Sequence, residues 1–229
     1  MKKFTLLELL VVISVIAILL TLLLPSLSKA RTKAKLAVCV SNNSQILRAL
    51  ATYVSANDQA TPSKWYRGNV TNQQKPAHGW LGIKTNNHPW NYRSLNVFLG
   101  VENSRSDIDS LDVAKCPLDN YSNGGRGGDS YFDYDGHSYM GNARSGGNLA
   151  LNDGNYGVFV SKVSTEPSRM VALNEFGGWS YAFGYGKNWG YSWHGESMYT
   201  LGFLDGHAQN MKVSSGLLIN DSYSFDKNQ

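Results

Sequence analysis

Hydrophobic and polar positions follow three different patterns along the 229-residue chain. The first pattern runs from Phe4 to Leu24, which is apolar at all but four positions and holds neither glycine nor proline. At a rise of about 1.5 Å per residue, an α-helix of this length spans about 30 Å, the hydrocarbon thickness of a bilayer. The pattern therefore predicts a transmembrane helix over residues 4–24.

One of the four polar positions is Glu8, which lies five residues into the apolar run. A charged side chain at that depth is costly unless something neutralises it, so an intramembrane carboxylate indicates a function. Two interpretations stay open: Glu8 pairs with a positive group inside the apolar environment, or it extends to the lipid headgroups at the near end of the helix.

The second pattern is amphipathic and covers residues 25–57. Apolar or small residues recur every three or four positions, interrupted only by Asn43, at Leu36, Cys39, Val40, Ile46, Leu47, Leu50, Tyr53 and Val54. We expect Pro25 to kink or loosen the helix without ending it, which gives one rod of about 50 residues that stops near Asn57. Its first half requires lipid, and its second half requires a packed domain.

The third pattern covers residues 58–229, where short apolar runs alternate with turn residues and where all six tryptophans lie. This texture predicts a small sheet with long loops. Strands are predicted over 170–175, 199–204 and 207–213, with a type I′ hairpin turn at Asp205-Gly206 between the last two. A short helix is predicted over 92–99, and loops over the glycine-rich segments 122–128 and 145–148.

Charge is concentrated in the N-terminal quarter. Seven of the 21 basic residues but only one of the 17 acidic residues precede residue 58, so this part carries +6 and the remainder −2. Positive charge beside a membrane span meets anionic headgroups, and nothing in it indicates a nucleic-acid surface. A secretory signal cleaved after Ala30 is an alternative, but the apolar run exceeds the usual 7–15 residues and the helical pattern continues beyond that site.

The two cysteines, Cys39 and Cys116, are compatible with one disulfide in an exported domain, and catalytic or metal-binding use has less support. Two short segments come near to enzyme or metal motifs. Residues 136–141 miss the spacing of a nucleophile elbow by one position. Residues 133–136 open like a calcium loop, but position 12 is Arg144 instead of glutamate; calcium binding by the carboxylate-rich segment 129–135 stays open, with solvated turn residues favoured. We expect no enzyme, no cofactor and no metal site.

The histidines and aromatic residues have two interpretations each. His194, Asp205 and His207 form a metal-binding cluster if they share a face of the hairpin, but structural hydrogen bonds are the favoured interpretation. The aromatic-rich segment forms either an exposed platform for sugars or partner proteins, or the core of the sheet, which is favoured; its members are Trp179, Tyr181, Tyr185, Trp189, Tyr191, Trp193 and Tyr199.

The segments Phe4-Thr5-Leu6, Glu8-Leu9-Leu10-Val11-Val12, Leu24-Pro25 and Ala30-Arg31 together resemble the signal and first helix of type IV pilins and type II secretion pseudopilins. The resemblance implies that residues 1–3 are a leader, which a prepilin peptidase removes by cleavage between Lys3 and Phe4, followed by methylation of the new amine. It also implies that Glu8 of one subunit neutralises the Phe4 amine of its neighbour. The family usually has glycine where Lys3 stands.

The globular part is similar to one bacterial branch of pilin-like proteins, in which a histidine is followed by nine residues and Asp-Gly. Here ten residues separate His194 from Asp205-Gly206. Three further segments are similar to that branch: Cys116-Pro117-x-Asp119, Ser138-Tyr139-x-x-Asn142 and Glu166-Pro167-Ser168. The resemblance implies an α+β fold, in which the long N-terminal helix packs on a small antiparallel β-sheet with long loops.

The function that the resemblance implies is structural. We expect a subunit anchored in the inner membrane by one helix, with its globular domain in the periplasm or at the cell surface. It polymerises with other pilin or pseudopilin subunits into a type II secretion pseudopilus or a type IV pilus-like filament. The alternative is a membrane-anchored module that binds carbohydrate or protein and does not polymerise.

Overall fold

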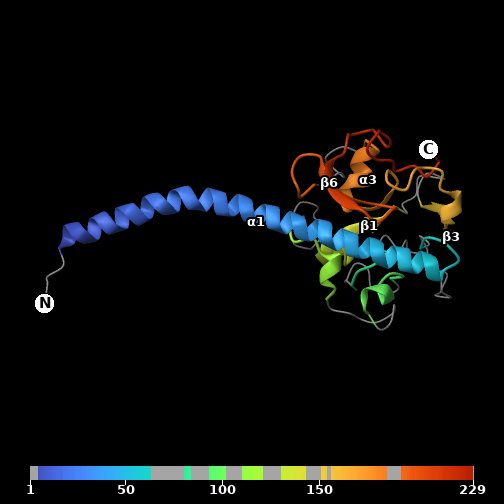
Figure 1. Cartoon of the computed structure of the whole chain (residues 1–229), viewed down its shortest axis with the longest axis horizontal. Helices are drawn as coiled ribbons and strands as arrows, with labels where there is room; N and C mark the ends of the chain where they lie inside the picture. Colours follow the sequence, from blue (N-terminus) through green and yellow to red (C-terminus); the bar gives the residue numbers. More distant parts are fainter. Residues whose placement is uncertain are drawn as a thin grey trace.

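The computed structural model describes residues 5–62, 80–83, 93–101, 110–120, 130–142, 151–153, 156–184 and 192–228. Helix α1 (Leu6–Ala56) extends far out of a domain formed by the rest of these residues (Figure 1). The second half of α1 packs on a four-stranded antiparallel sheet. The α+β fold with a long N-terminal helix, predicted above, is confirmed.

Helix α1 continues through Pro25 without a break and is bowed over its first half (Figure 1). It ends at Ala56 with Asn57 as its C-cap, and the next two residues have positive φ angles of 51° and 62°. Left-handed backbone ends a helix because the i→i−4 hydrogen bonds cannot continue through it. The predicted rod and its end near Asn57 are both confirmed.

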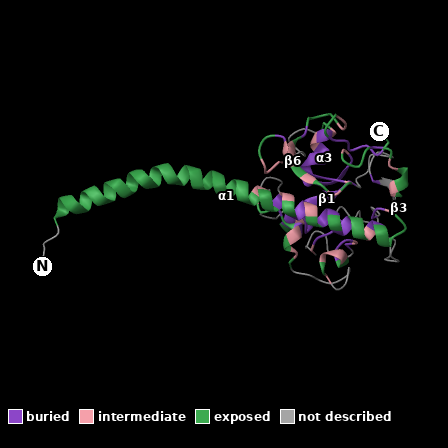
Figure 2. Ribbon diagram, in the orientation of Figure 1, coloured by how far each residue is buried: buried purple, intermediate pink, exposed green. Residues whose placement is uncertain are grey.

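The two halves of α1 differ completely in burial (Figure 2). Every residue from Thr5 to Lys35 is exposed. Beyond that point one face enters the core, with buried positions at Cys39, Asn42, Asn43, Ile46, Leu47, Ala49, Leu50 and Val54. The second half of the helix is therefore part of the folded domain, and a boundary placed after residue 57 divides the core.

The four-stranded sheet has the order β1-β4-β5-β6, and each neighbouring pair is antiparallel. Its strands are β1 (Tyr139–Gly141), β4 (Val171–Glu175), β5 (Met198–Phe203) and β6 (Ala208–Lys212). The last three agree with the predicted strands to within one residue at each end. Strand β1 was not predicted, and neither was the separate small hairpin of β2 (Asn152–Asp153) and β3 (Tyr156–Gly157).

The turn between β5 and β6 differs from the predicted type I′ turn. The N–H of Gly206 donates to the carbonyl of Phe203, and the N–H of Phe203 donates to the carbonyl of His207, both at 2.9 Å. Gly206 has a φ of 96°, whereas φ of Asp205 is not positive, although a type I′ turn requires positive values at both central residues. The loop therefore has three residues, 204–206, with glycine at the left-handed position.

Strand β5 separates two layers of packing because its side chains alternate between the faces of the sheet. Tyr199, Leu201 and Phe203 pack against helix α3 (Phe176–Ala182) and the C-terminal segment. On the other face, a Cβ atom added to Gly202 would lie 2.3 Å from Oδ1 of Asn43 in α1. The absence of a side chain at Gly202 thus lets the helix approach the sheet closely.

The remaining elements are short: α2 (Tyr131–Asp135), η1 (Val97–Leu99), η2 (Asp112–Ala114) and η3 (Val160–Lys162). The helix predicted over 92–99 is wrong in its described part, because residues 93–96 have no α-helical structure and only η1 follows. The solvated turn predicted at 133–135 is also wrong, since α2 contains these residues and Asp135 is buried. The predicted loops at 122–128 and 145–148, and Asp129, lie outside the described residues.

Candidate functional site

The N-terminal site expected at Lys3, Phe4 and Glu8 is described only from Thr5 onward. Glu8 and Thr5 form a capping box at the start of α1. Oε2 of Glu8 accepts hydrogen bonds from the N–H and the hydroxyl of Thr5, both at 2.8 Å, while the N–H of Glu8 donates to Oγ1 of Thr5 at 3.3 Å. This arrangement satisfies backbone donors that a helix start leaves free. The spacing Thr5-x-x-Glu8 is the sequence signature of this cap.

The exposed half of α1 is long and apolar enough to cross a membrane, by length and composition. None of its most apolar window is covered by the rest of the described chain. The helix that carries Glu8 therefore presents apolar side chains in all directions, with nothing from its own described domain to bury them.

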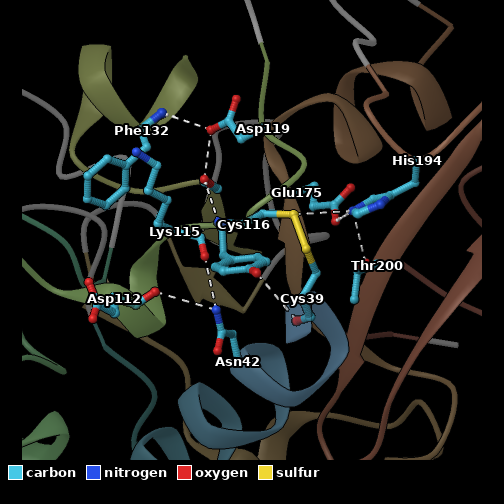
Figure 3. The surroundings of a disulfide bond; sticks show 12 residues. Cys39, Asn42, Asp112, Lys115, Cys116, Asp119, Phe132, Glu175, His194 and Thr200 are labelled. Carbon is cyan, nitrogen blue, oxygen red and sulfur yellow. Dashed lines mark hydrogen bonds and ion pairs between the residues drawn. A yellow bond between two sulfur atoms is a disulfide. The ribbon is translucent and has the colours of Figure 1, made fainter. Parts of the chain in front are cut away.

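The second candidate site surrounds a disulfide between Cys39 and Cys116, two residues with no exposed surface (Figure 3). The bond joins the start of the buried half of α1 to the segment that follows η2. A second link lies one turn further along α1, where Nδ2 of Asn42 donates to the carbonyl of Lys115 at 3.0 Å. The hydroxyl of Tyr139 in β1 donates to the carbonyl of Cys39 at 3.4 Å. Helix, loop and sheet thus meet at the disulfide.

Asp119 organises the loop on one side of the disulfide. Its carboxylate accepts from the N–H groups of Tyr131 and Phe132 at 3.0 and 2.9 Å and from the Ser138 hydroxyl at 2.7 Å. The oxygen of Ser138 in turn accepts from the N–H of Cys116 at 3.0 Å. This network joins the segments 116–119 and 138–142 in space. The Ser138 hydroxyl is therefore engaged in structural hydrogen bonds.

His194 and Glu175 lie together on the other side of the disulfide (Figure 3). Nε2 of His194 is hydrogen bonded to Oε1 of Glu175, and it lies 3.6 Å from Sγ of Cys116 and 3.4 Å from Oγ1 of Thr200. Neither member of the His194–Glu175 pair has any exposed side-chain surface. Burial raises the pKa of Glu175, opposed by the hydrogen bond and the charge of His194.

Sequence reasoning missed Glu175. The residue ends the strand β4 and precedes helix α3, so it resembled the polar end of an apolar strand. Only the fold places it beside His194, and no spacing between the two residues signals the contact. Its Oε2 atom and Nδ1 of His194 are both buried without a hydrogen-bond partner among the described residues.

The structure separates the residues of the His-Asp-Gly pattern. His194 lies at the disulfide, whereas Asp205 and Gly206 form the turn beyond the other end of β5. Asp205 accepts from the N–H of His207 at 3.1 Å and lies 2.6 Å from its Nδ1 atom. Asp205 therefore fixes the turn with His207, and these three side chains form no common metal site.

The aromatic residues that the structure describes belong mainly to the core. Trp179 and Tyr199 are buried, and Tyr181 and Trp193 are half-buried. Tyr185, Trp189 and Tyr191 lie outside the described residues. The described part of this segment is therefore core and not an exposed platform.

The disulfide cluster offers little chemistry in its oxidised form. Its sulfur atoms are bonded to each other, so neither is a nucleophile or a strong metal ligand. The ligand atoms of Cys39, Cys116 and His194 nevertheless lie within 4.8 Å of one another. No family model, no curated protein and no solved structure matches the chain.

Proposed function

We propose that the protein is a pilin-like structural subunit, anchored in a membrane by the first half of α1 and assembled into a filament through the same helix. The observation that carries the proposal is that the exposed apolar half and the buried half form one continuous helix. The apolar half must be covered by lipid before assembly and by neighbouring helices after it. In the filament, the domain of each subunit lies outside the bundle of packed helices.

Burial of the exposed half supplies a large driving force. Its large apolar side chains are 49–83% exposed from Leu6 to Leu27. Each such side chain is stabilised by roughly 1.5–3 kcal/mol on full burial. Lipid and helix bundles both satisfy this requirement, so the apolar surface alone does not distinguish an anchor from a filament.

Glu8 makes that distinction, because it has two separable properties. Its carboxylate caps the helix through Thr5, and its negative charge neutralises a cationic Phe4 amine of a neighbouring subunit in a filament. An anchor that never assembles needs only the cap. A filament needs the charge as well, because a mismatched subunit would leave the amine buried and unpaired.

The test compares two variants that each remove one property. Glu8→Gln removes the charge but keeps an oxygen that accepts from the Thr5 N–H. Thr5→Val removes Oγ1, and with it both side-chain hydrogen bonds of the capping box, and keeps the charge. We expect Glu8→Gln to abolish or disorder filaments in the native cell envelope, and Thr5→Val to assemble. Filaments are scored by electron microscopy of the sheared fraction, with membrane content of each variant measured by immunoblot as the control.

The opposite result would refute the assembly role of Glu8: normal filaments from Glu8→Gln and defective filaments from Thr5→Val. Intact mass of the native protein provides an independent check. A mature chain that begins with N-methylated Phe4 is expected, and a chain that begins at Arg31 would contradict the proposal. The alternative, a module that binds carbohydrate or protein, has weaker support because the described tryptophans are buried or half-buried.

A further inference from the structure

The cluster of Cys39, Cys116, His194 and Glu175 has the chemistry of a metal site whose two sulfur ligands are locked in a disulfide. We propose that reduction of this disulfide converts the cluster into a zinc site, in which the two thiolates, Nε2 of His194 and a carboxylate oxygen of Glu175 bind one Zn²⁺ ion. Two thiolates, an imidazole and a carboxylate are all ligands that zinc accepts in tetrahedral sites.

One ligand distance already fits a tetrahedral site, whereas the two bonded sulfur atoms must separate to about 3.8 Å after reduction. With Zn–S near 2.3 Å and Zn–N near 2.0–2.1 Å, a sulfur and a nitrogen ligand lie about 3.6 Å apart. Nε2 of His194 and Sγ of Cys116 are already 3.6 Å apart. Nε2 is the ring nitrogen that faces Sγ of Cys116 and Oε1 of Glu175, so α1, the loop after η2, β4 and the segment before β5 bring their ligands together (Figure 3).

Two buried atoms are consistent with a second state of the cluster. Oε2 of Glu175 has no hydrogen-bond partner that meets the geometric limits among the described residues, whereas Oε1 is held by His194. Nδ1 of His194 is likewise buried without a partner in that part of the chain. Metal binding at Nε2 requires the imidazole proton on Nδ1, and this N–H has no acceptor among the described residues.

The conversion balances as follows. A reductant supplies two electrons and the Cys39–Cys116 bond breaks into two thiols: a dithiol also supplies two protons and becomes a disulfide, whereas a phosphine takes oxygen from water, which supplies the protons, and becomes a phosphine oxide. Zn²⁺ then displaces both thiol protons to solvent, and the proton of Nε2 moves to Nδ1 of His194. Oxidation reverses these steps and releases the ion. Helix α1 would thus remain cross-linked to the domain in both redox states, by zinc in the reduced state and by the disulfide in the oxidised state.

The experiment uses the full chain in detergent micelles, either oxidised or reduced with a phosphine, and titrates it with Zn²⁺ and with Co²⁺ as a spectroscopic substitute. We expect the reduced chain to bind one Zn²⁺ ion and the oxidised chain none. Co²⁺ should give a thiolate-to-cobalt charge-transfer band and the visible absorption of a tetrahedral site. Equal zinc binding by the oxidised and reduced chains, or the absence of the thiolate band, would overturn the proposal.

Variants identify the ligands. His194→Ala is expected to lower the zinc affinity of the reduced chain at least about tenfold, because even outer-shell partners of zinc ligands contribute that much. His207→Ala is the matched control, since His207 is exposed at the hairpin tip, and its affinity should equal that of the wild type. Equal effects of the two variants would contradict the assignment.

A last measurement covers loss of structure on reduction. If the reduced chain loses its near-ultraviolet circular dichroism, zinc is expected to restore the signal in the wild type and His207→Ala, and not in His194→Ala. Zinc that binds without restoring the signal would mean adventitious binding to unfolded thiols, which would also overturn the proposal. His194→Cys, which keeps a ligand at this position, should retain the site.

Discussion

The contact between Gly202 of β5 and Asn43 of α1 gives the sharpest prediction about how the helix is held. A Cβ atom at residue 202 would lie 2.3 Å from Oδ1 of Asn43 and 2.8 Å from Cδ1 of Leu47. Asn43 and Leu47 are almost fully buried, at 0% and 3% exposed, so neither side chain has free space to move into. Gly202→Ala must therefore displace the helix or force these side chains from their rotamers.

The expected cost of Gly202→Ala is about 1–3 kcal/mol in the free energy of unfolding, the range for overpacking a well-packed core. For a domain of this size that corresponds to a Tm lower by roughly 2–4 °C for each kcal/mol. The assay is thermal unfolding of the full chain in detergent, followed by near-ultraviolet circular dichroism and tryptophan fluorescence.

Asn43→Ala provides the second arm of the experiment. Neither polar atom of the Asn43 side chain has a hydrogen-bond partner among the described residues, so its removal leaves no such donor or acceptor unpaired there. We expect a change of no more than about 1 kcal/mol from this variant alone. Asn43→Ala also removes Oδ1, the atom nearest to the methyl group that Gly202→Ala adds. The variant that carries both substitutions should therefore be more stable than the sum of the two single effects predicts, by about 0.5–3 kcal/mol.

Gly141→Ala is the control for this cycle. Its added Cβ would lie 2.3 Å from the Trp80 ring and not against Asn43. The variant should destabilise the protein without energetic coupling to Asn43→Ala. The reasoning would be refuted if Gly202→Ala unfolded at the wild-type temperature, or if its effect and that of Asn43→Ala were simply additive.

Two other predictions concern the surroundings of the disulfide. Replacement of both Cys39 and Cys116 by alanine should lower the free energy of unfolding by about 4.5 kcal/mol in the chain-entropy model, because the bonded residues are 77 positions apart; an unchanged urea midpoint would contradict this. Burial raises the pKa of Tyr139 well above 10, so its contribution to stability is fully present below pH 10 and is lost as the pH rises toward the raised value. Tyr139→Phe should remove that alkaline loss, by up to about 1.4 kcal/mol per pH unit, and parallel pH profiles of variant and wild type would show the inference to be mistaken.

The parts of the fold that were predictable carry a long or strongly apolar pattern. Helix α1 follows from an apolar run and a stripe that together cover more than 50 residues, and β4 and β5 follow from compact apolar segments. Strand β1 has three residues, too few to show a period of two. The turn type at Asp205 was missed because pairing of Phe203 with His207 requires a three-residue loop, which depends on register and not on the Asp-Gly pair alone.

The candidate site was less predictable because its contacts are tertiary. Two cysteines allow only one pairing, but their proximity depends on how α1 lies on the sheet. Asn43 appeared as an interruption of the apolar stripe, and the structure places it against Gly202, which is more than 150 residues away in the sequence and leaves room for it. The partner of His194 could not be found from spacing, because Glu175 lies at the end of β4 and His194 in the segment before β5.

The position of the disulfide along α1 connects the two halves of the molecule. Cys39 is the first fully buried residue of the helix, at the point where the exposed rod enters the domain. A bend or pull on the rod reaches the domain first at this residue, where packing alone would be weakest because only the following turns are covered. The covalent bond to Cys116 and the hydrogen bond from Asn42 to Lys115 resist such a load there. A cross-link at any later turn would leave the first buried turn of α1 without a covalent bond to the domain, so the position of the disulfide at residue 39 fixes the helix where it enters the domain.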